Sequence, residues 1–345
     1  MGPPLTPDLI SVLVRFRQWQ VGITSDITRA FLQVGVREQD RDSLRFLLRL
    51  EENDDIRHFR FCRVPFGLCC SSFLLNATLK VHLESMGTSS ALKALRDLYV
   101  DDLITGGDSK DDVLDFVREI NSAFRDAGMN LSKWKSNCPV VLDGINGIHR
   151  SEAGVDLSVI DPSDSKVLGM SWSQSNDVLM LSFKNHKQVV LNTKRKILKM
   201  LGQLFDPIGI VTSFVITLKI IFQRLWTFPL DWDDLIPKSL EDEASDWCRN
   251  LMRLTLSIPR RYFDESLSAL AESGSLQMHV FCDASLRAYG SVVFLRRVRT
   301  DGSVELSFVM AKSRVAPLKS ITLPRLELLA ALIGSRFLAC IRKSL

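Results

Sequence analysis

The sequence has few of the features that are typical of secreted proteins, of proteins with structural zinc sites or of membrane-spanning proteins. Its 7 cysteines are odd in number and form no C-x-x-C pair, which indicates neither a disulfide framework nor a zinc site. A reducing compartment therefore fits best. The most apolar run, residues 208–222, is shorter than the about 20 residues of a bilayer span, and Lys219 interrupts it. We interpret this run as a buried helix.

The N-terminal residues and the lack of repeats exclude further classes of protein. The residues MGPPLTPDLI have neither the basic stretch nor the apolar run of a signal peptide, and no internal repeat or low-complexity tract is visible. We therefore expect an intracellular protein that is not secreted and has no membrane partner. What is present is a chain of 345 residues, 46% of them hydrophobic, which is enough for two or three compact units. The formal net charge of +4 permits a polyanionic partner.

Strand and helix patterns alternate in the first 140 residues. Extended segments are predicted at ITSD, FLQVGV, SLRFLLRL and HFRFCRV, and a helix at SSFLLNATLKVHLESMG. The segments DLYV and LIT then form a hairpin that turns at Asp101 and Asp102. Ser109 is the predicted N-cap of the next helix, which ends before Gly128. This order predicts an α+β fold in which helices cover one side of a sheet.

The pattern changes after residue 140. A hairpin with Asn176 and Asp177 at its turn is followed by a basic helix from Thr193 that stops before Pro207. From residue 277 strands return, and a closing helix is predicted with Thr322 as N-cap. We expect domain boundaries near residues 140 and 275.

The adjacent acids of the YVDDL segment need an explanation. Asp is common in hairpin turns because its side chain bonds to local backbone groups, and Asp26 taken alone fits a cap or turn residue better than a catalytic one. Two flush carboxylates, however, raise each other's pKa unless a cation lies between them. With Asp26 at the end of a neighbouring strand, Asp101 and Asp102 would complete an oxygen-lined Mg²⁺ site. Such a site can hold two ions about 4 Å apart.

Several segments resemble, in order, the polymerase motifs of reverse transcriptases. They are SDITRAFLQVGV, RVPFGLCCSSFLLNATL, YVDDLITGG and GMNLSKWKSN. Their residues resemble those of BEL/Pao-type long-terminal-repeat retrotransposons. TKRKILKMLGQLFDPIGIVTSF, FCDASLRAYGSVVFLR and KSRVAPLKSITLPRLELLAALIGSR resemble downstream parts of the same polyproteins. The resemblance covers nearly the whole chain. It implies an RNA-directed DNA polymerase, a nucleotidyltransferase that uses two metal ions to join a nucleotide to a primer 3′-hydroxyl.

The resemblance also implies a division into domains. Residues 1–140 would be a right-hand polymerase palm with residual fingers, 141–275 a helical thumb and connection, and 276–345 the N-terminal part of a ribonuclease H-like domain. Only 25 residues precede Asp26, so we expect most of the fingers and the rest of the ribonuclease H domain to be missing. On that expectation, the isolated chain would extend a primer undetectably or very slowly.

Carried over by motif, Asp26, Asp101 and Asp102 resemble the catalytic metal ligands of the family. Phe31 resembles the aromatic gate that excludes a ribose 2′-hydroxyl, although a core aromatic is the ordinary explanation for such a residue. Phe66 and Gly67 resemble the loop that shapes the nucleotide pocket, where Gly67 would allow close backbone approach. The following Ser71–Ser72 replaces the Ser-Pro of many family members.

The remaining site residues are cations and a second acid pair. Lys135, or Lys133, would neutralise the leaving pyrophosphate; a solvated strand lysine is the alternative. The basic helix would contact template–primer phosphates through Lys194, Arg195, Lys196 and Lys199, or else present a solvated face. Asp283 and Glu327 resemble the first Mg²⁺ ligands of ribonuclease H, although Glu327 also suits a helix N-terminus.

The resemblance implies several partners: an RNA or DNA template–primer, deoxynucleoside triphosphates and the rest of the Pol polyprotein, in a cytoplasmic particle or the nucleus. One alternative is an inactive retrotransposon remnant that still binds nucleic acid. Another is an aspartic peptidase, because this region is often labelled as the Pao retrotransposon peptidase family. Such enzymes need Asp-Thr-Gly or Asp-Ser-Gly, and neither tripeptide occurs, so we expect the label without the activity.

Overall fold

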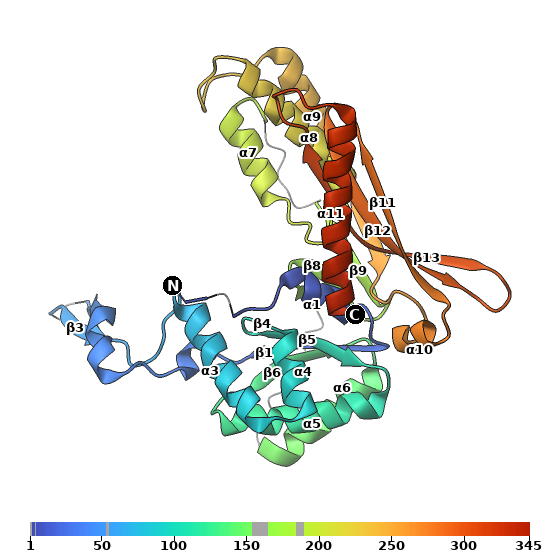
Figure 1. Ribbon diagram of the computed structural model, residues 1–345. Coiled ribbons are helices and arrows are strands. Elements are labelled where there is room, and N and C mark those ends of the chain that lie inside the picture. The colour runs from blue at the N-terminus through green and yellow to red at the C-terminus, as the bar shows by residue number, and fades with distance from the viewer. Residues whose placement is uncertain (1, 4, 53–54, 154–164, 184–189) are drawn as a thin grey trace. The chain divides into compact units, whose positions relative to one another are not determined.

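The computed structural model describes residues 2–3, 5–52, 55–153, 165–183 and 190–345 (Figure 1). Its contacts divide the chain into two compact units. Unit 1 comprises Met1–Asp8 and Val21–Pro162, and unit 2 comprises Leu9–Gln20 and Ser163–Leu345. The boundary between the two units therefore falls after residue 162, and the N-terminal segment Leu9–Gln20 belongs to unit 2. The division into three domains at 140 and 275 stays a prediction.

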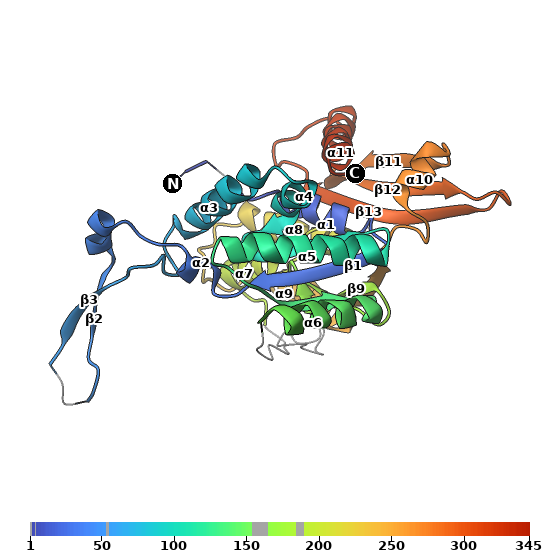
Figure 2. The same ribbon diagram turned by 90° about the horizontal axis from the view of Figure 1, so that it is seen from below.

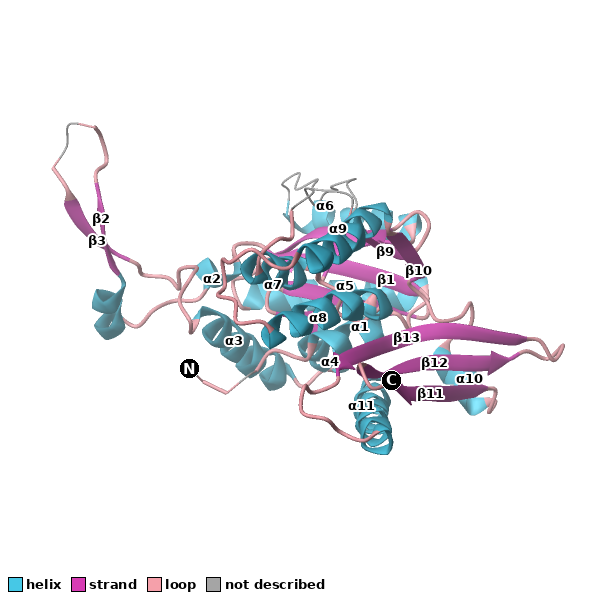
Figure 3. Cartoon of the chain, turned by 90° about the horizontal axis from the view of Figure 1, so that it is seen from above, coloured by secondary structure: helices cyan, strands magenta, loops and turns pink. Residues whose placement is uncertain are grey.

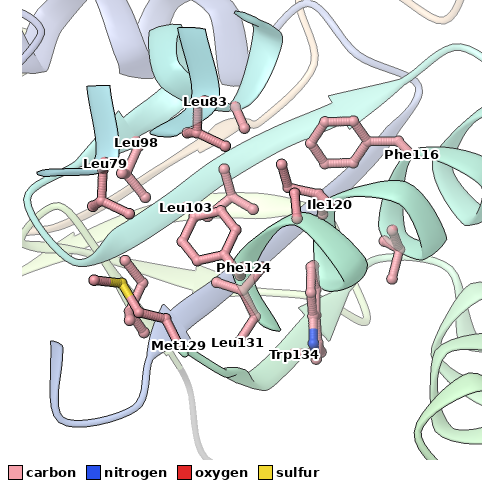
Figure 4. Packing of buried hydrophobic residues seen from close by; sticks show 14 of the residues in the cluster. Leu79, Leu83, Leu98, Leu103, Phe116, Ile120, Phe124, Met129, Leu131 and Trp134 are labelled. Atoms are coloured by element: carbon pink, nitrogen blue, oxygen red, sulfur yellow. The ribbon is translucent and has the colours of Figure 1, made fainter. Parts of the chain in front are cut away.

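Unit 1 is built on a four-stranded antiparallel sheet with strand order β4-β5-β1-β6. Its strands are β1 (Val21–Ile27), β4 (Leu98–Tyr99), β5 (Asp102–Gly107) and β6 (Leu131–Ser136). Its longer helices are α3 (Ser71–Met86), α4 (Ser89–Asp97), α5 (Lys110–Asp126) and α6 (Pro139–Ala153). Side chains from these helices and strands share one buried core (Figure 4). The predicted order of strands and helices in this region is confirmed, although α4 and α6 were not foreseen.

Helix α5 shows why the sequence folds in this way. The Ser109 hydroxyl accepts a hydrogen bond from the backbone N–H of Asp112, which caps the helix, and Gly128 follows its end at φ 71°. Its buried face includes Phe116 and Phe124, which lie close to the strand residues of the core in Figure 4. Helix α5 therefore anchors the sheet that carries the Asp101–Asp102 hairpin.

A smaller hairpin extends from the core of unit 1. It consists of the 3₁₀ segment η1 (Glu38–Leu44), β2 (Arg45–Leu48) and β3 (Arg57–Arg60), and Figure 2 shows it standing away from the sheet. Stacking of the Phe46 and Phe59 rings, with centroids 5.7 Å apart, holds its strands together.

One predicted element of unit 1 is wrong. Part of FLQVGV forms the short helix α2 (Ala30–Gln33) instead of an extended strand. Arg29 before it has the left-handed φ of 51°, and Ala30 and Phe31 are buried by the helical turn. The gain from burying these two side chains outweighs the extended preference of the local pattern.

Unit 2 contains two sheets and several helices. The first sheet has the order β10-β9-β8-β7 and the second the order β11-β12-β13. The strands are β7 (Ser165–Val167), β8 (Met170–Ser173), β9 (Val178–Ser182), β10 (Thr255–Pro259), β11 (Leu276–Ala284), β12 (Ala288–Val298) and β13 (Val304–Val315). The helices are α1 (Leu9–Phe16), α7 (Lys194–Gln203), α8 (Thr212–Arg224), the 3₁₀ turn η2 (Leu225–Thr227), α9 (Lys238–Arg253), α10 (Leu267–Glu272) and α11 (Leu323–Ser344).

A buried arginine ties the N-terminal segment into unit 2. The Arg260 guanidinium is fully buried and donates to both carboxylate oxygens of Asp177, at 2.6 and 2.8 Å. It also donates to the backbone carbonyls of Phe16 and Trp19. Because burying a charge is costly unless it is paired and fully hydrogen-bonded, this set of partners explains why residues 9–20 belong to the second unit.

The three-stranded sheet of unit 2 is an antiparallel meander crossed by α11, and Figure 3 shows its strands side by side. Gly334 allows the helix to lie close to the sheet, because an added Cβ would come within 2.7 Å of the Cys282 sulfur. Thr322 precedes this helix at the N-cap position, but its side chain makes no capping hydrogen bond. The strands and the closing helix predicted for this region are confirmed.

The apolar run at residues 208–222 contributes to α8, whose Val215, Leu218 and Ile221 are buried. The prediction of a buried helix is therefore confirmed. Within the ranges that the structure describes, no helix combines the length and the apolar character needed to cross a membrane.

Candidate active site

The β1–β5 register brings the predicted acids of unit 1 together. Asp26 on β1 is the Cα partner of Asp102 on β5, and the backbone N–H of Ile27 donates to the Asp101 carbonyl at 2.9 Å. Because Asp101 directly precedes β5 in the same hairpin, all three acids lie at one end of the β1–β5 pair. The expected placement of Asp26 and the Asp pair on neighbouring strands is confirmed; that their carboxylates share metal ions stays a prediction.

The hairpin that carries the pair is tight and strained. The last ladder pair is Tyr99 with Asp102, so Val100 and Asp101 alone form the turn. Val100 has a φ of 59°, a left-handed value that is unusual for a β-branched residue. Two-residue hairpins demand such values, and strain of this kind gathers at functional sites. The turn presents the two adjacent carboxylates at the end of the hairpin.

The acids are close enough to disturb one another's ionisation. Burial, followed by the charges of Asp101 and Asp26, raises the pKa of Asp102 to about 6. Burial also raises the pKa of Asp101, with a smaller contribution from Asp26 in the same direction. The ammonium of Lys133 opposes both shifts. The site therefore carries excess negative charge, which a cation would relieve.

Lys133 reaches this site because of a backbone irregularity. The β1–β6 register shifts between Thr24 and Asp26, and Lys133 adopts a φ of 56°. Its Nζ lies 3.4 Å from Oδ2 of Asp26. Lys135, the first choice from the sequence, pairs instead with Thr24 in the ladder. The structure thus brings the alternative lysine to the acids; the pyrophosphate role of either lysine stays a prediction.

The donor set determines which ion these residues suit. Three carboxylates offer hard oxygen ligands, which Mg²⁺ prefers. The raised pKa values of Asp101 and Asp102 and the lysine ammonium beside Asp26 indicate a place that favours positive charge. As the side chains lie, no three His, Cys, Asp or Glu residues in the described part of the chain are arranged to hold an ion. The chemistry of the residues fits a divalent ion.

The predicted nucleotide-pocket residues Phe31 and Phe66 touch each other. Their rings meet edge to face with centroids 5.0 Å apart; Phe31 is 8% exposed and Phe66 is 66% exposed. Gly67 has a φ of 87°, and no atom of the described residues lies within 4 Å of where a Cβ would be. Ser71 occupies the Ser position of the expected Ser-Pro pair, and its hydroxyl donates to the Pro65 carbonyl and holds this loop. Phe31 is part of the core, and its role as a gate stays a prediction.

The basic helix α7 does not present all four of its predicted cations. Lys194 is only 3% exposed, its Nζ donates to the Leu230 carbonyl at 2.7 Å, and its ammonium lies 4.5 Å from the Trp226 ring centroid. Arg195, Lys196 and Lys199 are exposed. Of these three surface cations, Arg195 already donates to both carboxylate oxygens of Asp233, at 2.7 and 2.9 Å.

The second predicted acid pair belongs to unit 2. Asp283 lies near the end of β11, opposite Gly290 on β12, and Glu327 lies early in α11. Both residues are exposed, and α11 packs on β11. Their placement on a strand and a helix in contact agrees with the sequence. Their roles as metal ligands stay a prediction.

Sequence reasoning missed one buried charged group next to the Asp101–Asp102 hairpin. Asp97, the last residue of α4, has no exposed surface and bonds to Thr105 of β5. The signal was available, because an acid in the apolar segment ALKALRDLYV is unusual for a buried helix face.

Comparison with known proteins agrees with this geometry. Residues 5–202 match the family described as reverse transcriptase (RNA-dependent DNA polymerase), and residues 193–345 match the family described as Pao retrotransposon-like RNaseH-like domain. The second description names no peptidase. A comparison with curated proteins finds no match.

Two solved structures of a foamy viral protease–reverse transcriptase share the fold. One, in complex with an RNA/DNA hybrid, has 14% identity and a TM-score of 0.57 over 99% of this chain and 39% of that chain. The other, a dRH form in complex with double-stranded DNA, has 15% identity and a TM-score of 0.60 over 99% of this chain and 51% of that chain. This chain thus spans about half or less of those chains.

The reverse transcriptase match covers more than half of the chain, and it contains the three acids and the strands that carry them. The resemblance found in the sequence motifs is therefore confirmed. The chain belongs to the reverse transcriptase family and carries a Pao retrotransposon-like, ribonuclease H-like domain in residues 193–345.

Proposed function

We propose that this chain is an RNA-directed DNA polymerase that adds deoxynucleotides to a primer 3′-hydroxyl. The observation that carries the proposal is the register of β1 and β5, in which Asp26 opposes Asp102 while Asp101 is held by the backbone N–H of Ile27. The family match over residues 5–202 supports the same reaction class.

The site residues have separate tasks in this proposal. Asp26, Asp101 and Asp102 would hold two Mg²⁺ ions, which when bound supply charge stabilisation for phosphoryl transfer. Lys133, whose Nζ already lies 3.4 Å from Asp26, would neutralise charge on the departing pyrophosphate. Phe31 would support the sugar and exclude a 2′-hydroxyl.

The partners proposed are a template–primer and deoxynucleoside triphosphates. Both solved relatives are described in complex with nucleic acid, one with an RNA/DNA hybrid and one with double-stranded DNA. In this chain, the exposed Arg195, Lys196 and Lys199 of α7 would contact phosphates without reading sequence. Binding of this kind weakens steeply with salt.

Asp283 and Glu327 are proposed as Mg²⁺ ligands of the ribonuclease H-like domain. The family match over residues 193–345 and the packing of α11 on β11 support this assignment. An Asp283→Asn variant should bind an RNA/DNA hybrid unchanged but lose any Mg²⁺-dependent cleavage of its RNA strand. Equal cleavage by both proteins would contradict the assignment.

Primer extension tests the polymerase proposal. We expect slow, Mg²⁺-dependent extension of a DNA primer on an RNA template at excess protein, and none from the Asp101→Asn/Asp102→Asn variant. A double variant of two exposed acids in the same unit, Asp111→Asn/Asp126→Asn, is the matched control and should extend normally. Extension that survives in the Asp101/Asp102 variant, or is lost equally in the control, would contradict the proposed site.

A further inference from the structure

A buried acid lies immediately before the hairpin that carries Asp101 and Asp102. Asp97 ends α4 and has no exposed surface, and its Oδ2 accepts a hydrogen bond from the Thr105 hydroxyl at 2.7 Å. Thr105 is equally buried in the middle of β5, three residues after Asp102. The bond therefore joins the two ends of the hairpin, across a chain separation of 8 residues.

A second charged residue of α4 holds the same strand. Lys93 lies one helical turn before Asp97, its Nζ donates to the carbonyl of Gly106, and its ammonium lies 5.1 Å from the Phe116 ring centroid. Burial lowers the pKa of Lys93, and the charge of Asp97 opposes that shift. Helix α4 is thus attached to β5 at two consecutive residues, Thr105 and Gly106, through partners of opposite charge.

The hairpin needs such attachments because its own ladder is short. Strand β4 has two residues, and within the described residues its ladder pairs are Leu98 with Leu103 and Tyr99 with Asp102. A two-stranded hairpin of this length is marginal by itself, and the left-handed Val100 adds strain. The residues directly before Leu98 belong to α4, so the ladder stops there. Side chains of that helix bond to β5 in place of further ladder hydrogen bonds.

We propose that Asp97, together with Thr105 and Lys93, forms a positioning set that fixes the catalytic hairpin so that Asp101 and Asp102 stay opposite Asp26. None of the three touches substrate in this proposal; they act through the backbone of β5. The inference rests on the proposed polymerase function. A loose hairpin would leave the acids present but misplaced, and misplacement by 1 Å can cost on the order of 10²-fold in rate.

The hydrogen bond between Asp97 and Thr105 can be removed and restored by single substitutions at Thr105. Asp97 also contacts Arg96 of its own helix, whose Nε lies 3.6 Å from the Asp97 Oδ1. A buried carboxylate that loses one donor keeps the desolvation cost and loses part of the compensation. Removing the Thr105 hydroxyl therefore deletes the hydrogen bond between Asp97 and β5 and leaves the contact with Arg96 within α4. Thr105→Val keeps the shape of the side chain and deletes only that donor, and Thr105→Ser restores it.

The experiment compares Thr105→Val, Thr105→Ser and a matched control in two measurements. The control is Thr78→Val on α3, an exposed threonine whose hydroxyl bonds only to the helix carbonyl of Leu74 in the described contacts. The first measurement is amide hydrogen exchange, followed separately for residues 98–107 and for α5. The second is the kcat and the nucleotide KM of primer extension.

We expect Thr105→Val to accelerate exchange in residues 98–107 but not in α5, and to lower kcat on the order of 10-fold with little change in KM. Thr105→Ser should restore both values, and Thr78→Val should change neither. Lys93→Met, which keeps the stem and removes the ammonium, should show the same pattern and serves if Thr105→Val does not fold.

Two results would overturn the positioning role. One is unchanged exchange in residues 98–107 with normal kcat; the other is faster exchange spread evenly over the hairpin and α5, which would indicate general destabilisation. Absence of extension by the unaltered chain would instead contradict the proposed function, and the exchange measurement would still decide whether Asp97 and Thr105 hold the hairpin.

Discussion

Asp26 and Asp102 face each other as register partners across β1 and β5, although they lie 76 positions apart in the sequence. Burial and the two neighbouring acids raise the pKa of Asp102 to about 6. A strand pair that brings like charges together gives up stability at neutral pH.

The stability of the metal-free protein should depend on the ionisation of Asp102. Its folded pKa of about 6 lies above the ordinary value of 3.8. The stability that the Asp102 carboxyl contributes to the fold is therefore fully present below pH 3.8 and is lost as the pH rises through 6. Asp102→Asn should therefore stabilise the fold at pH 8 by about 1 kcal/mol, a value reduced for solvent screening because Asp102 is only partly buried.

Urea unfolding at pH 8 and pH 4.5, with EDTA present, measures this effect. Most of the gain should vanish at pH 4.5, where Asp102 in the folded protein is largely protonated. Asp126→Asn, which changes an exposed acid at the end of α5, is the control and should show no such pH dependence. A variant that is less stable than the unaltered protein at pH 8 would refute the raised pKa.

Unit 2 should depend strongly on its buried ion pair. Arg260→Met leaves the Asp177 carboxylate without its main partner, and breaking a buried pair costs about 3–5 kcal/mol. Arg224→Met removes the exposed pair with Glu243 and should cost at most about 1 kcal/mol. Guanidinium unfolding followed by tryptophan fluorescence compares the two. Equal losses would show that the buried pair contributes no more than a surface one.

The cations of α7 should govern binding to a template–primer. Arg195→Gln, Lys196→Gln and Lys199→Gln should each weaken binding and lower the slope of log affinity against log salt by about 1. The control pair Lys238→Gln and Arg249→Gln, exposed on α9, should leave that slope unchanged. Fluorescence anisotropy at several salt concentrations measures the slope. A slope that stays the same in all three α7 variants would exclude this helix as the phosphate contact.

Phe31 distinguishes a gate from a core residue. If it excludes the 2′-hydroxyl, Phe31→Val should raise the use of ribonucleotides relative to deoxynucleotides in primer extension. If it only packs in the core, where it is 8% exposed, both substrates should lose rate equally. The ratio of the two rates decides, because a loss of stability alone cancels in it. An unchanged ratio would assign Phe31 to the core.

The acid site was predictable because local patterns specify it. Short apolar segments identify β1 and β5, and the Asp pair between two short strands identifies the hairpin turn. The lysine beside the acids was harder, because Lys133 and Lys135 fit the same pattern. Only the register shift between Thr24 and Asp26 separates them, and a bulge leaves little trace in a hydrophobic pattern.

Other features depend on contacts far apart in the chain. The local sequence pattern places Lys194 on a basic helix face. In the structure Lys194 is buried by Trp226 and the Leu230 carbonyl, which follow more than 30 residues later. Arg260 bonds to backbone carbonyls of residues 16 and 19, which lie more than 240 positions earlier. No local pattern reports such pairings, so the assignment of residues 9–20 to unit 2 required the structure.

Single-nucleotide addition by the unaltered chain and by Asp26→Asn tests the central claim most directly. The assay uses a DNA primer on an RNA template, with and without Mg²⁺. We expect addition that requires Mg²⁺, that stops on chelation, and that falls by at least on the order of 10²-fold in Asp26→Asn. Addition at the same rate in both proteins would contradict it.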